Sequence, residues 1–82
     1  MGHHLFADYS KGESLAHTWI RWPCLRVSTV SFPSNAGCED ALIETWIFSE
    51  CPKHKSRQIF HRTRTKAVKA HEHIVSNLKT KI

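Results

Sequence analysis

Hydrophobic and polar positions alternate along two stretches in the first half of the chain. In the clearer one, residues 25–32, Leu25 and Val27 share one side with Thr29, and polar residues lie between them. A period of two in a run rich in β-branched residues indicates a half-buried strand. Residues 15–22 alternate in the same way and are dense in aromatic and β-branched residues. The pattern therefore predicts two strands, over 15–22 and 25–32.

Residues 38–50 fit two structures. Apolar residues four apart, such as Leu42 and Trp46, are compatible with a helix face. Against a helix, the run at 45–48 consists of β-forming residues, and Pro52 soon ends the segment. We favour a strand, and a helix remains the alternative.

The last part of the chain changes period. Residues 57–62 predict a short, basic strand, which we place at a sheet edge because positive side chains discourage pairing with another chain. From residue 66 the apolar positions follow a helical repeat, and Thr65 is the expected N-cap. The apolar stripe of this helix comprises Ala67, Val68, His71, Ile74, Val75, Leu78 and Ile82.

The order of these elements, β-β-β-β-α, predicts a small α+β fold. We expect a four-stranded antiparallel sheet with the C-terminal amphipathic helix packed on one face. Residues 1–14 have little periodicity and are expected to form a loose N-terminal arm, which leaves residues 15–82 as a single domain. A chain of 82 residues is near the lower limit for a self-sufficient core, so a homodimer is a further expectation.

Three short blocks carry a resemblance to known proteins. They are Arg26-Val27-Ser28-Thr29-Val30, Ile43-Glu44-Thr45-Trp46-Ile47-Phe48, and residues 65–75, which include Ala70-His71-Glu72. In this order they resemble blocks of small uncharacterised bacteriophage and prophage proteins, in which Ser-Thr-Val, Glu-Thr-Met before an aromatic residue, and Gly-His-Glu recur. This chain departs from them at residues 31–35, in place of a Gly-Leu-Asp-His-Asn-like loop, and at Ala70, in place of glycine. The resemblance implies a phage origin and the same topology, and no activity.

The three cysteines, Cys24, Cys38 and Cys51, are odd in number and widely spaced. This pattern is untypical of a secreted disulfide framework, so we expect free thiols and a reducing compartment. The N-terminus lacks the basic and apolar regions of a signal peptide, and no apolar run is long enough to cross a bilayer. The sequence therefore predicts a cytoplasmic protein, in a bacterial host cell, that has no membrane partner.

His71 is the residue most suggestive of a site, because helical spacing puts its imidazole in an apolar stripe. A buried histidine must satisfy two ring nitrogens. One interpretation is a core histidine that bonds to the sheet, at Glu44 or Thr45. The other is a small polar site formed by His71 and Glu44.

Catalytic and metal-binding motifs are weak. Cys51 and His54 have a C-x2-H spacing, but the second ligand pair of a zinc site is missing. The chain also has no nucleophile elbow and no phosphate-binding glycine loop. We expect neither an enzyme nor a cofactor or metal.

Charge gives the strongest hint of a partner. Nine of the twelve lysines and arginines follow residue 50, against one acid, Glu72. Such a one-sided field favours nucleic acid or acidic protein surfaces. The sequence therefore predicts a phage-type accessory protein that binds a host protein or ribonucleoprotein, for example a CRISPR effector that it inhibits. The alternative is a small basic nucleic-acid-binding protein. The expected contact residues are Lys53, Lys55, Arg57, Arg62, Arg64, Lys66 and Trp22.

Overall fold

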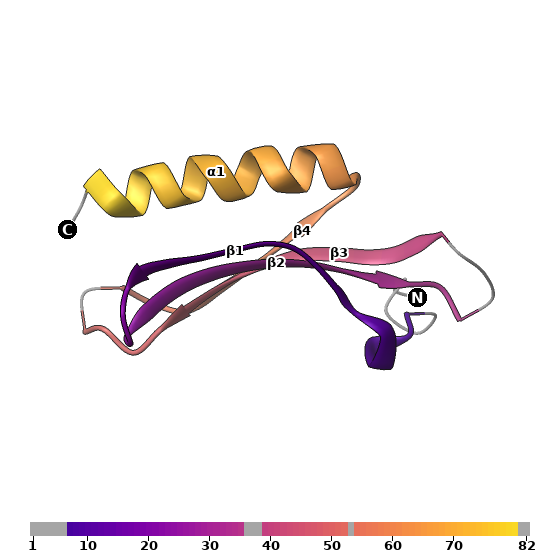
Figure 1. The fold of residues 1–82 in the computed structure, drawn as a ribbon, viewed down its shortest axis with the longest axis horizontal. Helices are drawn as coiled ribbons and strands as arrows, with labels where there is room; N and C mark the ends of the chain where they lie inside the picture. The colour runs from indigo at the N-terminus through magenta and orange to yellow at the C-terminus, as the bar shows by residue number, and fades with distance from the viewer. Residues whose placement is uncertain (1–6, 36–38, 53, 81–82) are drawn as a thin grey trace.

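A computed structural model describes residues 7–35, 39–52 and 54–80, which form one antiparallel sheet and one long helix (Figure 1). The strands are β1 (Glu13–Arg21), β2 (Leu25–Pro33), β3 (Asp40–Ser49) and β4 (Arg57–His61), paired in the order β1-β2-β3-β4. Helix α1 (Arg64–Thr80) follows β4 directly. The predicted α+β class, with its β-β-β-β-α order, is confirmed.

Strand β3 resolves the ambiguity at residues 38–50 in favour of a strand. It pairs with β2 on one side and with β4 on the other, and Thr45 lies opposite both Thr29 and Ile59. A central strand can bury side chains on both faces, which explains the four consecutive buried residues 42–45. In the sequence alone, apolar residues on both faces of a strand give the same spacing as the apolar stripe of a helix. Cys38 lies outside the described residues.

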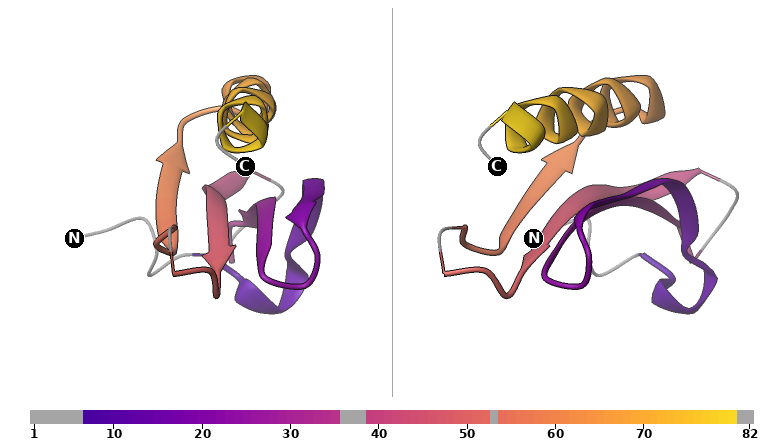
Figure 2. Two further views of the ribbon diagram at one scale, coloured as in Figure 1. Left: turned by 90° about the vertical axis from the view of Figure 1, so that its left-hand side faces the viewer. Right: turned by 60° about the vertical axis from the view of Figure 1, so that its left-hand side comes forward.

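Helix α1 lies along one face of the sheet, as both views in Figure 2 show. Ala67 and His71 are its buried residues. Further along, Ile74, Val75 and Leu78 pack against a core cluster of Leu25, Val27 and Ile47. Most of the predicted apolar stripe therefore faces the core; Val68 is half-buried, and Ile82 lies outside the described residues.

The helix begins earlier than its sequence predicts. The hydroxyl of Thr63 accepts a hydrogen bond from the backbone N–H of Lys66 at 3.1 Å, and its carbonyl accepts one from Ala67 at 3.0 Å. Thr63 is thus the N-cap, and the assignment of Thr65 to that role is wrong. Both threonines have the right chemistry, and the short link from β4 decides which one is placed at the helix end.

Residues 7–14 of the expected N-terminal arm are tied to the sheet. The N–H of Asp8 donates to the carbonyl of Pro33 at 2.8 Å, and Ala7 forms an isolated bridge with Ser34. A short 3-10 turn, η2 (Tyr9–Lys11), then leads into β1, which begins two residues before its predicted start. The ring of Tyr9 packs 5.1 Å from that of Phe32, centroid to centroid. These contacts fix the segment at the end of β2.

Cys24 and Cys51 form a disulfide, so the expectation of free thiols is wrong for this pair. Cys24 precedes β2 and Cys51 follows β3, and the antiparallel register brings them together: Leu25 lies opposite Ser49, and the N–H of Glu50 donates to the carbonyl of Cys24. Their Cα atoms are 5.6 Å apart. The argument for a reducing compartment relied on free thiols and loses that basis.

Candidate macromolecule-binding face

The face of the sheet opposite α1 is the candidate site. In the described part of the chain no helix lies over it, apart from η2 at one end (Figures 1 and 2). Since Thr18 and Thr29 bond to His71 on the helix side, their sequence neighbours point the other way. The register then sets Trp19 opposite Arg26, and Arg26 opposite Phe48, on this open face.

These side chains form a continuous row across three strands. The guanidinium carbon of Arg26 lies 4.1 Å from the ring centroid of Phe48 and 5.6 Å from that of Trp19. The rings of Trp19 and Trp22 meet edge to face at 4.4 Å. On β3, the rings of Phe48 and Trp46 stack nearly parallel at 5.5 Å. We call the set Trp22, Trp19, Arg26, Phe48 and Trp46 the aromatic row.

The row is accessible to a partner. Trp22 exposes 72% of its surface, Trp19 39% and Phe48 37%. The role of Trp22 as an anchor stays a prediction. Edge-to-face and cation-π contacts hold the side chains in place at the surface, which lowers the entropy that binding would otherwise remove.

The carboxylate of Glu44 bonds to Trp46, the residue at one end of the row. Its carboxylate accepts hydrogen bonds from the indole N–H of Trp46 and from the side-chain amide of Gln58, each at 2.7 Å. Glu44 is 6% exposed, so the indole ring that it holds is tied to a buried group. The carboxylate therefore positions Trp46 within the row.

A hollow of about 300 Å³ adjoins the row where β2 and β3 meet the loop before β4. Arg26 and Phe48 line it together with the polar residues Ser49, Glu50 and Ser56. The remaining lining residues are Pro23 and Cys24.

On the other face, His71 lies at the centre of a polar network under the helix. Its Nε2 lies 2.9 Å from the hydroxyl of Thr18, and its Nδ1 lies 2.8 Å from that of Thr29. The hydroxyl of Thr29 is 2.6 Å from that of Thr45, which in turn is 2.8 Å from Nε2 of His61. The chain of bonds crosses all four strands and includes the helix.

This network is satisfied with both histidines neutral. Each hydroxyl can donate to the next group along the chain in either direction, so both ring nitrogens of His71 and Nε2 of His61 find a partner. Burial lowers the pKa of His71, with a smaller effect from His17 and a small opposing one from Glu72. Burial also lowers the pKa of His61. The arrangement fits a core histidine bonded to the sheet, the first of the two interpretations, but the expected partners Glu44 and Thr45 are wrong. The direct partners are Thr18 and Thr29, and Thr45 is reached only through Thr29.

The polar site of His71 and Glu44 is wrong as a joint site. Glu44 follows Ile43 and precedes Thr45 on β3, so its side chain points to the open face while that of Thr45 points to the helix. The two residues belong to separate networks on opposite faces of the sheet. The single step along a strand between Glu44 and Thr45 decides which one shares a network with His71.

The predicted basic residues are spread along one edge of the molecule. Lys55 precedes β4, Arg57 opens it, Arg62 follows it, and Lys66 lies in the first turns of α1; all four are exposed. Within the described part of the chain they form no ion pair, whereas Lys53 lies outside the described residues.

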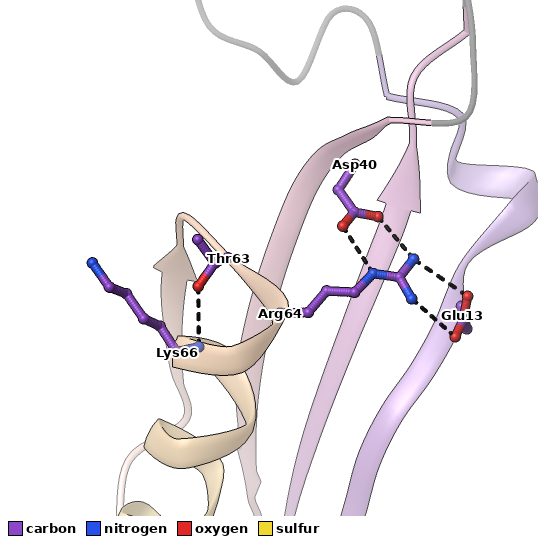
Figure 3. Close-up of polar contacts among 5 residues, drawn as sticks. All are labelled: Glu13, Asp40, Thr63, Arg64 and Lys66. Carbon is purple, nitrogen blue, oxygen red and sulfur yellow. Dashed lines mark hydrogen bonds and ion pairs between the residues drawn. The ribbon is translucent and has the colours of Figure 1, made fainter.

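Arg64 differs from the other basic residues, because its charge is paired within the molecule. Its guanidinium donates two hydrogen bonds to Asp40, at 2.8 and 2.9 Å, and two longer ones to Glu13 (Figure 3). The bonds from Arg64 lower the pKa of Asp40. Arg64 thus connects the start of α1 to β1 and β3, and we leave it out of the contact surface.

Most of the aromatic row was missed by the charge argument, which considered only residues after position 50. The sequence does hold a signal for it: Arg26 alternates with core residues, and a hairpin register would pair it with Trp19. The sequence does not show that Arg26 lies opposite Phe48, because that pairing depends on the length of the connection between β2 and β3.

Metal ligands do not converge in the described residues, where no three of the His, Cys, Asp and Glu side chains form a group. Cys51 of the C-x2-H pair is taken up by the disulfide. The helix found in the described residues is not long and apolar enough to cross a membrane. Comparison with protein-family models, curated proteins and solved structures found no match.

Proposed function

We propose that this chain is a non-enzymatic, phage-type accessory protein that binds a macromolecule of its bacterial host through the open face of the sheet. The observation that carries the proposal is the exposed aromatic row, in which Trp19 and Phe48 flank the guanidinium of Arg26 and Trp22 packs on Trp19. Tryptophan and arginine dominate the binding energy of many interfaces. Large apolar rings exposed together on one face are typical of contact surfaces.

The row is also suited to binding because its side chains are already ordered. Three antiparallel strands fix their spacing, and the Glu44 carboxylate holds Trp46. Side chains that are ordered before association lose less freedom on binding. The face can therefore use its aromatic area for affinity.

The partner class that we propose is a host protein or ribonucleoprotein, with an antiviral defence complex such as a CRISPR effector as the first to test. Two features support it: the sequence blocks that resemble phage proteins, and the net charge of +5. A basic protein with an aromatic contact face suits a complex that presents acidic surface or RNA. This is an argument by analogy of size, charge and resemblance.

The proposal is tested by capture of partners from a bacterial lysate. The bait proteins are the unaltered chain, the double variant Trp22→Ala, Phe48→Ser, and a matched control, Tyr9→Ser, which removes an exposed ring outside the row. We expect the unaltered chain and Tyr9→Ser to capture the same host component and the double variant to lose it. Capture that is equal for all three baits would contradict a contact through the aromatic row.

A further inference from the structure

We infer that the aromatic row binds single-stranded nucleic acid, with bases stacked on its rings and phosphates held by Arg26 and the neighbouring basic residues. This inference rests on the proposed function, because it names the occupant of the same face. It differs from the sequence-based alternative, in which the basic residues alone make the contact.

The shape of the row suits a short run of stacked bases. Neighbouring strands in a sheet lie about 4.8 Å apart, so side chains on three strands span the length of two or three stacked bases. Trp22 and Trp19 offer one pair of rings, and Phe48 with Trp46 offers a second, stacked pair. Aromatic rings stack on any base, and each such contact contributes about 1–3 kcal/mol.

The charge of Arg26 also favours a nucleic acid. It lies between the rings of Trp19 and Phe48, and its polar contact is with Nε2 of His17, 3.3 Å away. Within the described part of the chain it forms no ion pair. A cation held among aromatic rings without a carboxylate partner suits a phosphate, which it can bind with two parallel hydrogen bonds.

The hollow beside Arg26 and Phe48 leads from the row toward a further basic residue. It is also lined by Ser56, and the residue before Ser56, Lys55, is exposed. Lys55 forms no ion pair within the described residues. Arg57 lies opposite Ile47, on the helix side of the sheet, so the next cation for a strand that leaves the row at Phe48 is Lys55.

A single strand fits these features better than a duplex or a protein. In a duplex the base faces are stacked on one another and cannot meet the rings of the row. An acidic protein surface would satisfy the cations, but it would leave the flat rings without matching planes. Glu50, an exposed residue that lines the hollow, can accept a hydrogen bond from the edge of an unpaired base.

The test measures quenching of tryptophan fluorescence by 12-nucleotide strands of oligo-dT and oligo-rU, and by a duplex of equal length, at 50 and 200 mM salt. We expect single strands to quench the fluorescence and to bind at least tenfold more tightly than the duplex. Binding should weaken between the two salt concentrations, because phosphate contacts release counterions.

Single-residue variants show which side chains contact the oligonucleotide. By electrophoretic shift with the same strands, Phe48→Ser should weaken binding about tenfold, which corresponds to the loss of one stacking contact. Arg26→Gln should weaken it and reduce its salt dependence, and so should Lys55→Ser. Tyr9→Ser is the matched control and should bind like the unaltered chain. Circular dichroism of each variant establishes that it is folded.

The remaining outcomes distinguish failure of the inference from failure of the proposed function. If no single strand binds at 50 mM salt, or if Phe48→Ser binds as well as the unaltered chain, the inference is overturned. If, in addition, a protein is captured from nuclease-treated lysate and lost in the row variant, the proposed function stands without the inference. If the row variants change neither oligonucleotide binding nor capture, both are overturned.

Discussion

The Nδ1 atom of His71 lies 2.8 Å from the hydroxyl oxygen of Thr29, so the middle of the helix is bonded to the middle of the sheet. His71 is 3% exposed and Thr29 is fully buried. A hydrogen bond between buried groups is worth most as a constraint, because alternative packings leave both groups without a partner. This pair therefore fixes the position of α1 along the strands, which apolar contacts alone specify loosely.

Replacement of His71 should destabilise the fold. In His71→Leu the hydroxyl of Thr18 loses its ring partner, and that of Thr29 keeps only Thr45. We expect the free energy of unfolding in urea to fall by about 1–3 kcal/mol, the usual cost of buried polar groups that lose a partner. His73→Leu, at an exposed position on the same helix, is the control and should change it little. Equal stability of both variants would contradict the constraint.

Stability should fall in mild acid because of the same network. Burial lowers the pKa values of His71 and His61 in the folded chain, while the unfolded chain titrates near the ordinary value of 6.5. Above that pH both states are neutral at these rings, so the two rings cause no change of the free energy of unfolding with pH. Below it the unfolded state binds more protons, and the free energy of unfolding decreases down to the folded-state pKa values.

The measurement is urea denaturation at intervals from pH 8 to pH 5. The decrease below about pH 6.5 should be smaller in a double variant, His61→Gln with His71→Gln, than in the unaltered chain. A pH dependence that is the same for both proteins would show that other groups cause it.

The sequence predicts this fold well because its two periods are clear. Alternation at Leu25, Val27 and Thr29 identifies both a strand and its buried face, and the repeat through Ala67 and His71 does the same for the helix. The phase of alternation also limits which side chains can meet. Alternation does not identify the buried face of a strand that is buried on both faces. This is the case at residues 42–45, where consecutive residues are all buried.

The site is harder to predict because it depends on register between strands. Whether Glu44 or Thr45 shares a face with His71 changes with a shift of one residue. The disulfide has the same origin: Cys24 and Cys51 are 27 residues apart and meet only because β2 and β3 pair along their full length. Charge counting likewise finds Arg64 among free cations, whereas the fold pairs it with Asp40.

The disulfide predicts a defined thiol count. In denaturant without reductant, one of the three cysteines should react with a thiol reagent, and after reduction all three should react. Reduction, or Cys24→Ser, should lower the free energy of unfolding by about 3 kcal/mol, since the cross-link closes a long loop in the unfolded chain. Cys38→Ser is the control and should leave the shift on reduction in place. Three reactive thiols before reduction would contradict the pairing.

Replacement of Glu44 tests whether the row must be held rigid in order to bind, because it removes no ring from the row. In Glu44→Leu no ring of the row is removed, but the indole N–H of Trp46 loses its acceptor. We expect a loss of about 1–3 kcal/mol in the free energy of unfolding. We also expect weaker binding of single-stranded oligonucleotides, because Trp46 is no longer held against Phe48. Glu44→Gln keeps an acceptor for the indole and should retain most of the binding. Weak binding by both Glu44→Gln and Glu44→Leu would show that the carboxylate charge is needed. Full binding by Glu44→Leu would show that the row does not need the hydrogen bond between Glu44 and Trp46.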